Sequence, residues 1–165
     1  MTLAEAAAQA DELAVAGDQK GLATLRQQWA DELEASARSR DYRIRAQAYR
    51  AIAQFRYRQK LQLLRRGLED ASPAARGSAV IALEGLSRTH PGDVNGMRAL
   101  LHELATNDDN VSVRRLAIVC LKNGSPQRET IQLLNGLADD DEQEGELRKT
   151  AKAVAAALKK RADTR

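Results

Sequence analysis

One short pattern recurs four times along the chain and constrains its fold more than any other feature. It reads apolar-Arg-x-x-Ala-x-x-x-apolar, where x is any residue, and the four copies begin at Ile44, Ala75, Val113 and Leu147. The arginines of successive copies are 31, 38 and 34 residues apart. Residues three and four positions apart lie on one face of a helix, and a spacing of this size suits one two-helix hairpin per copy. We therefore expect a stack of helix pairs.

Apolar periodicity predicts helices over almost the whole chain. The predicted segments are 3–17, 18–38, 41–55, 57–68, 73–86, 94–105, 111–121, 128–138 and 147–160. The composition of 30 Ala and 21 Leu against seven Val and five Ile favours helices over strands and makes an all-β or parallel α/β fold unlikely to form. The longest apolar runs, such as 116–121, are far shorter than the roughly 20 residues of a membrane helix.

Polar residues precede the repeated helices. Asp41, Ser72 and Asn110 stand four residues before the first three arginines, where their side chains can cap a helix start. The fourth copy, which is the weakest, has Glu144 there. In the first helix of the series, Ile44, Ala48, Ala51, Ile52 and Phe55 are predicted to form the buried face.

The segment 55–58, Phe-Arg-Tyr-Arg, stands where other copies have turn residues. Two alternatives follow: a tight turn that uses neither Gly nor Pro, or two helices that run on as one.

The two middle copies share further residues with each other. Both have Asp, then a capping residue two positions later, then the arginine and alanine of the repeat, over 70–83 and 108–121. In this they resemble the HEAT repeat, specifically its short bacterial form. The resemblance covers roughly residues 40–160. It implies an all-α fold, a right-handed α-solenoid of about four HEAT-like helix pairs with an N-terminal helical cap.

On this interpretation the chain is a single domain, 1–165, with a cap over 1–38, repeats over 39–160 and a tail over 161–165. The resemblance also implies that Asp and Arg link adjacent repeats through a polar ladder. The residues that would form this ladder, and would therefore be structural, are Asp70, Arg76, Asp108 and Arg114.

The sequence contains no constellation typical of a catalytic or metal site. It has no Gly-rich phosphate loop, no zinc-protease motif and no nucleophile elbow. His90 and His102 are twelve residues apart, and Cys120 lies in an apolar run. The acidic run 139–142 lacks the ligand spacing of a calcium loop. We therefore expect no cofactor, no metal and no enzymatic activity. We also expect a cytoplasmic protein, because a single cysteine forms no internal disulfide and the acidic N-terminus lacks a secretion signal.

Charge is distributed unevenly. The 29 residues from Arg38 to Arg66 hold ten bases and one acid, a net +9 in a chain of formal charge +3, together with four of the five aromatic residues. Nine of the ten bases are Arg, which forms planar bidentate contacts with carboxylates and phosphates and stacks on rings. This basic segment is the candidate binding surface. A second basic cluster on the last helix is interpreted as the polar face of a terminal repeat.

These features predict a non-catalytic protein-binding or adaptor protein, a scaffold that engages an acidic protein partner. The candidate binding residues are Arg43, Arg50, Arg56, Arg58, Lys60, Arg65 and Arg66. Four alternatives remain open. The bases could serve solubility and pair with acids of the preceding helix, such as Asp31, Glu32 and Glu34; they could bind a nucleic-acid backbone; the protein could be a small immunity or inhibitor protein; or it could resemble the HEAT-like DNA glycosylases and lyases. No membrane partner is expected, and the oligomeric state stays open.

Overall fold

The computed structural model describes residues 1–164, and over these residues the chain forms ten α-helices, one 3-10 helix and no strand. The first five helices are α1 (Leu3–Val15), α2 (Gln19–Ala37), α3 (Tyr42–Gln54), α4 (Leu61–Leu68) and α5 (Pro73–Ser87), with the 3-10 helix η1 (Arg58–Lys60) before α4. The other five are α6 (Pro91–Asn95), α7 (Arg98–Asn107), α8 (Val111–Leu121), α9 (Arg128–Asp139) and α10 (Gly145–Asp163). The predicted all-α fold class is confirmed. The right-handed winding stays a prediction.

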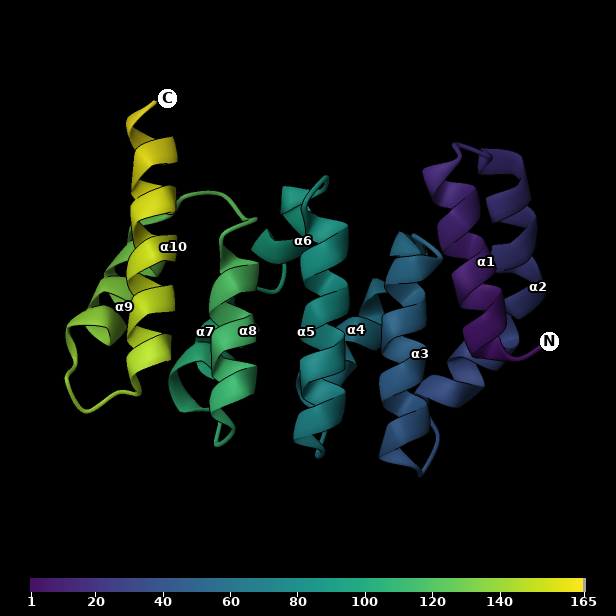
Figure 1. The fold of residues 1–165 in the computed structure, drawn as a ribbon, viewed down its shortest axis with the longest axis horizontal. Helices are drawn as coiled ribbons and strands as arrows, with labels where there is room; N and C mark the ends of the chain where they lie inside the picture. Colours follow the sequence, from purple (N-terminus) through teal and green to yellow (C-terminus); the bar gives the residue numbers. More distant parts are fainter. Residues whose placement is uncertain (165) are drawn as a thin grey trace. The chain divides into compact units, whose positions relative to one another are not determined.

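The helices divide into two compact units, Met1–Leu86 and Ser87–Arg165. In unit 1, α1, α3 and α5 lie in one layer, with α2 and α4 in a second layer behind them (Figure 1). In unit 2, α8 and α10 form one layer, and α7 and α9 the other. The single domain predicted from the sequence, with its cap, repeats and tail, stays a prediction.

The core of each unit is built from the repeated alanines and the leucines around them. The four repeat alanines, Ala48, Ala79, Ala117 and Ala151, have no exposed surface. A side chain of one methyl group lets helices approach closely, and larger residues such as Leu64, Leu83 and Leu134 fill the space beside them with no exposed surface of their own. Cys120 is fully buried, which confirms its interpretation as a small core residue.

The predicted helix caps are confirmed. A side-chain oxygen of Asp41 accepts a hydrogen bond from the backbone of α3, Asn110 does the same for α8, and the Ser72 hydroxyl accepts one from Ala75 N at 3.4 Å. Glu144 caps α10 in the same way, with bonds from two backbone amides at 2.9 and 3.1 Å. The fourth copy therefore keeps the local geometry of the others although its capping residue differs.

The segment 55–58 is a tight turn, which decides between the two alternatives left by the sequence. The Arg56 amide donates to Ala53 O at 3.0 Å, and the Tyr57 amide donates to Ile52 O at 2.9 Å. These two hydrogen bonds form the Schellman motif, in which Arg56 adopts the left-handed backbone conformation at φ +51°. Glycine usually occupies this position, so its absence concealed the turn in the sequence.

We expect Arg56→Gly to be more stable than Arg56→Ala by about 1 kcal/mol, because only glycine adopts the left-handed backbone without a steric penalty. Both variants lose the same side-chain contacts, so their difference isolates the backbone. Urea unfolding followed by the fluorescence of Trp29, the only tryptophan, measures it in unit 1. Equal stability of the two variants would contradict a left-handed residue 56.

The helix predicted over 94–105 is wrong as a single element. The structure has α6 and α7 there, with Gly96 and Met97 between them. Gly96 N donates to Gly92 O and Met97 N to Val94 O, so α6 ends as its own turn. The apolar periodicity of the sequence continues across the break, because Val94 before it and Leu101 after it are both fully buried.

Candidate functional site

The seven candidate binding residues are distributed over several elements of unit 1. Arg43 and Arg50 lie on α3, Arg56 in the following turn, and Arg58 and Lys60 in η1, whereas Arg65 and Arg66 belong to α4. Of these seven, Arg43 and Arg50 line a groove on the layer formed by α1, α3 and α5. The basic segment is thus not one continuous site around that groove.

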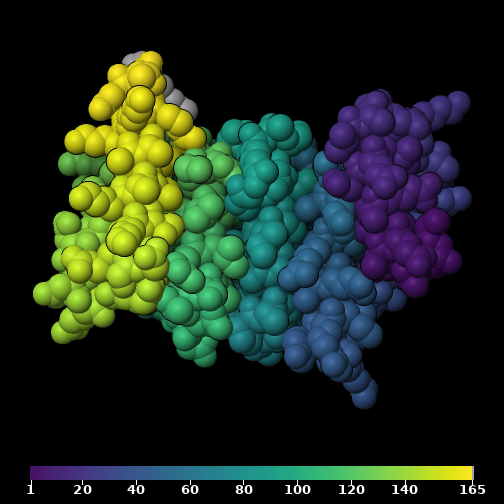
Figure 2. All heavy atoms as spheres, viewed as in Figure 1, coloured from purple at the N-terminus to yellow at the C-terminus, as the bar shows by residue number. Residues whose placement is uncertain are grey.

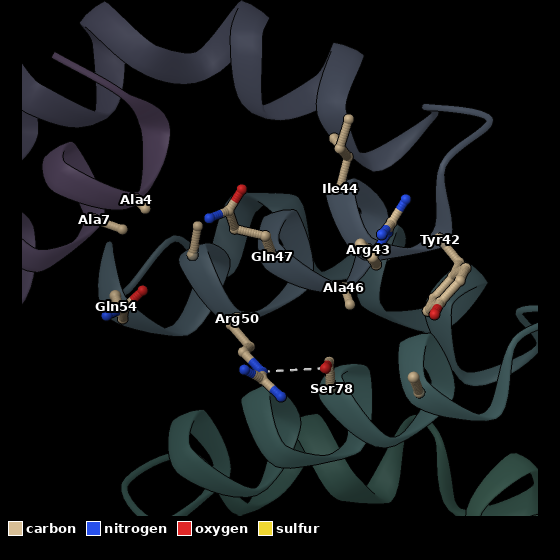
Figure 3. Close-up of a pocket in the computed structure, with 12 residues that line it drawn as sticks. Ala4, Ala7, Tyr42, Arg43, Ile44, Ala46, Gln47, Arg50, Gln54 and Ser78 are labelled. Carbon is tan, nitrogen blue, oxygen red and sulfur yellow. Dashed lines mark hydrogen bonds between the residues drawn. The ribbon is translucent and has the colours of Figure 1, made fainter.

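The groove encloses about 610 Å³ and runs along α3 (Figure 3). Its edges carry small side chains, Ala4 and Ala7 from α1 and Ala74 and Ser78 from α5. Figure 2 shows the face of unit 1 on which these three helices are exposed. The small edges leave the longer side chains of α3 accessible along its length.

Alternating arginine and glutamine side chains follow the exposed face of α3. Arg43, Gln47, Arg50 and Gln54 are four, three and four residues apart, and all line the groove. With a rise of about 1.5 Å per residue, the two arginines are about 10 Å apart along the helix. The groove therefore presents a row of hydrogen-bond donors, two of them charged.

Two apolar side chains at the start of α3 are exposed in the same groove. The prediction that Ile44 belongs to the buried face of this helix is wrong, because Ile44 is 42% exposed. It lies one turn before the buried Ala48, near the beginning of α3, and Figure 3 shows Ala4 and Ala7 of α1 toward the other end of the groove. Tyr42 is 46% exposed and also lines the groove, on the opposite side of α3 from Ile44.

A buried hydroxyl orients Arg50. The Arg50 Nε donates a hydrogen bond to Ser78 Oγ at 3.1 Å, and Ser78 is only 1% exposed. Figure 3 shows this bond from α3 to α5. Because Nε is engaged, the outer edge of the planar guanidinium, formed by its two terminal nitrogens, remains for a bidentate contact.

Arg43 has a local partner but remains accessible. Its Nε lies 3.2 Å from Asp41 Oδ1, while its side chain is 77% exposed. Its guanidinium also lies 5.9 Å from the ring centre of Tyr42. Hydrogen bonds from the backbone and side chain of Arg43 lower the pKa of Asp41, so this carboxylate stays charged as the cap of α3.

Arg56 and Lys60 are engaged within the chain. Arg56 Nη1 pairs with Asp11 Oδ1 of α1 at 2.7 Å and also donates to the carbonyls of Ala53 and Gln54. Lys60 Nζ pairs with Glu34 Oε1 of α2 at 2.8 Å. The hydrogen bond from Lys60 lowers the pKa of Glu34. These two bases tie the turn after α3 to the N-terminal helices, as the solubility and pairing alternative anticipated for Glu34.

The other three candidates lie away from the groove. Arg58 and Arg66 are exposed, whereas Arg65 is half-buried in α4. Of the seven, Arg43, Arg50, Arg58 and Arg66 are the residues whose side chains are exposed.

A buried polar network lies behind this surface. Arg45 makes a bidentate contact with Asp70, with both N–O distances 2.8 Å, and the Tyr49 hydroxyl donates to Asp70 Oδ2 at 3.0 Å. Burial disfavours the charged Asp70, but the bonds from Arg45, from the Ser72 amide and from Tyr49 outweigh it, and the pKa of Asp70 is lowered. Burial and the bond to Asp70 raise the pKa of Tyr49 to about 12. This network joins α3 to the turn before α5.

The four repeat arginines share a second role that spacing alone did not reveal. Each donates to a backbone carbonyl at or just beyond the end of the preceding helix. The bonds are Arg45 to Ser39 O at 2.9 Å, Arg76 to Asp70 O at 2.9 Å, Arg114 to Ala105 O at 2.9 Å and Arg148 to Ala138 O at 3.1 Å. Such carbonyls lack partners within their own helix. Of the four ladder residues, Asp70 contacts Arg45; a ladder through Arg76, Asp108 and Arg114 stays a prediction.

Three further arginines, which the repeated sequence pattern does not mark, hold turns in place. Arg26 donates to Phe55 O at 2.7 Å and to Arg56 O at 2.8 Å, which closes the end of α3. In unit 2, Arg98 donates to Ser125 O at 2.9 Å, and Arg161 donates to the carbonyls of Lys122 and Gly124. None of the three belongs to the repeated pattern, so no local signal marked it.

The two histidines of the chain lie apart. His90 is exposed before α6, and the His102 Nε2 lies 2.8 Å from Thr130 Oγ1 inside unit 2, where burial lowers the pKa of His102. Within residues 1–164, no group of three or more His, Cys, Asp or Glu side chains is arranged to hold a metal ion. None of the helices described is both long and apolar enough to cross a bilayer.

Comparison with known families agrees with the helix pairs. The sequence model of the HEAT repeats matches residues 30–103. This match begins within α2 and ends within α7. No curated protein matches the chain. HEAT repeats generally mediate protein–protein interaction and are typically non-catalytic.

Proposed function

We propose that the chain, whose residues 30–103 match the HEAT repeats, is a non-catalytic binding or adaptor module that engages an acidic protein partner through the exposed bases of its basic segment. The observation that carries the proposal is the position of Arg43 and Arg50, which line an open groove. Arginine contacts to carboxylates are charge-assisted and bidentate, which gives specificity as well as affinity.

The acidic partner is favoured over a nucleic acid by the way the bases are arranged. A phosphate backbone requires a continuous track of bases, whereas here Arg56 and Lys60 are paired with Asp11 and Glu34. The groove also ends in exposed apolar side chains, Tyr42 and Ile44, which contribute to protein contacts.

Affinity capture from lysate at low and high salt, followed by mass spectrometry, tests this proposal. The variant replaces the four exposed bases Arg43, Arg50, Arg58 and Arg66 by Glu. The matched control reverses Lys149, Lys152, Lys159 and Lys160, four exposed bases of α10, and so changes the net charge by the same amount. We expect the first variant to lose an acidic protein that the control retains.

Two results would contradict the proposal. If the first variant captures the same acidic protein as the wild type, the basic segment does not bind the partner. Capture that disappears after nuclease treatment of the lysate would assign the same arginines to a nucleic acid, whose binding weakens steeply with salt.

A further inference from the structure

We infer that the groove along α3 is the binding site itself, and that its occupant is an acidic segment of the partner carrying one large apolar side chain. This inference rests on the proposed function and makes it specific. The carboxylates of the segment meet Arg43 and Arg50, and its apolar side chain covers Ile44.

Charge complementarity selects an acidic occupant. The groove residues described by the structure include two arginines and no carboxylate. The Asp41 carboxylate, which pairs with Arg43, is not among them, and Arg43 is exposed enough to exchange this contact for a carboxylate of the partner. A neutral or basic segment would supply no opposite charge to Arg50 and would leave Arg43 with Asp41 alone.

The apolar end of the groove selects a mixed rather than a purely acidic segment. Ile44 and Tyr42 are two of the six large hydrophobic side chains that are exposed over the described residues, and both line the groove, on opposite sides of α3. Covering Ile44 removes apolar surface from water, a contribution that salt does not screen. Binding should therefore weaken with salt without disappearing.

Ser78 is a positioning residue for this contact. Its hydroxyl holds Arg50 Nε at 3.1 Å, and its burial prevents it from moving with the ligand. Arg50 is thus already oriented before the partner arrives, and less side-chain entropy is lost on binding.

The length of the segment follows from the length of α3. The 13 residues of α3 extend about 20 Å, which corresponds to about six residues of an extended chain or about thirteen of a helix. The probe is accordingly a displayed library of random peptides of about twelve residues, selected on the immobilised full chain, with the strongest peptides then measured by fluorescence anisotropy. We expect enriched peptides to combine two or more Asp or Glu with one aliphatic or aromatic residue.

Variants locate these peptides on the surface. Arg43→Glu, Arg50→Glu and Ile44→Asp should each weaken binding at least about tenfold. Lys159→Glu is the matched control, since this exposed base of α10 lies outside both the basic segment and the groove, and it should leave affinity unchanged. Circular dichroism melting of each variant checks that the fold is intact.

Ser78→Ala should weaken binding about threefold, because it removes the bond that orients Arg50. Its effect should be much smaller in the Arg50→Glu background, because two residues that act through one contact are not additive. A purely structural effect of Ser78 would be additive and would overturn its positioning role.

The outcomes separate this inference from the proposed function. If acidic peptides bind and are lost with Arg66→Glu but not with Arg43→Glu or Arg50→Glu, the proposed function holds and the groove is the wrong site. If the enriched peptides are acidic but Ile44→Asp binds them normally, the mixed occupant is wrong. If the enriched peptides lack acidic residues, both the inference and the acidic partner are overturned.

Discussion

Asp70→Ala is expected to lower the free energy of unfolding of unit 1 by about 3 kcal/mol, the low end for breaking a buried ion pair. The Asp70 side chain is 5% exposed, and its removal leaves the Arg45 guanidinium and the Tyr49 hydroxyl without their shared acceptor. Urea unfolding followed by Trp29 fluorescence measures the loss. The matched control is Glu69→Ala, at the adjacent and exposed position, which should change stability by less than about 0.5 kcal/mol.

The same carboxylate gives stability a pH dependence. Its pKa is lower in the folded chain than the value of about 3.9 in an unfolded one, so the folded state holds the proton less tightly. The contribution is therefore fully present above about pH 4 and is lost as the pH falls through the folded pKa. The stability difference between the wild type and Asp70→Asn should shrink below about pH 4; a difference that stays constant down to pH 2 would show that folding does not lower the pKa of Asp70.

The second large effect is expected from Gly67→Ala. A methyl group at residue 67 would lie 2.7 Å from the Ala79 side chain and 3.0 Å from the Tyr49 ring, both of which are fixed in the core. Alanine favours a helix by about 1 kcal/mol over glycine, but overpacking of a tight contact costs about 1 to 3 kcal/mol. We expect a net loss of stability of about 1 kcal/mol for Ala and a larger loss for Val.

Gly85→Ala provides the control in the same unit. A methyl group there has no neighbour within 4 Å, so the helix preference acts alone and should stabilise α5 by about 0.5 to 1 kcal/mol. Thermal melting of both variants tests whether Gly67→Ala lowers the stability and Gly85→Ala raises it. If Gly67→Ala were as stabilising as Gly85→Ala, the close approach of α4 and α5 at this glycine would be wrong.

Most helix positions could be predicted because each depends on local spacing. The capping residues Asp41, Ser72 and Asn110 and the buried repeat alanines follow from helix periodicity and from the chemistry of a helix start. The break between α6 and α7 could not be predicted in this way, because buried apolar residues continue on both sides of it.

The candidate site depended on contacts that are distant in sequence. Arg56 and Asp11 are 45 residues apart, and Arg50 and Ser78 are 28 apart, so no local pattern assigns one base to an internal pair and the other to the groove. The exposure of Ile44 also could not be predicted from local sequence. Periodicity places it on the buried face, but in the structure it is 42% exposed, at the end of the groove away from Ala4 and Ala7 of α1.

Internal pairing also affects how quickly a partner arrives. Within the basic segment, Arg38, Arg43, Arg45, Arg56 and Lys60 each lie against a carboxylate of the chain. These five bases share four carboxylates, and one of the four, Asp41, is already counted in the +9, so the other three lower the local charge only to about +6. We expect this remaining charge to raise the association rate constant for an acidic partner above the unsteered value of about 10⁵ to 10⁶ M⁻¹s⁻¹, and we expect the rate constant to fall as salt is added. Differences in affinity among variants of the groove would still lie mainly in the lifetime of the complex.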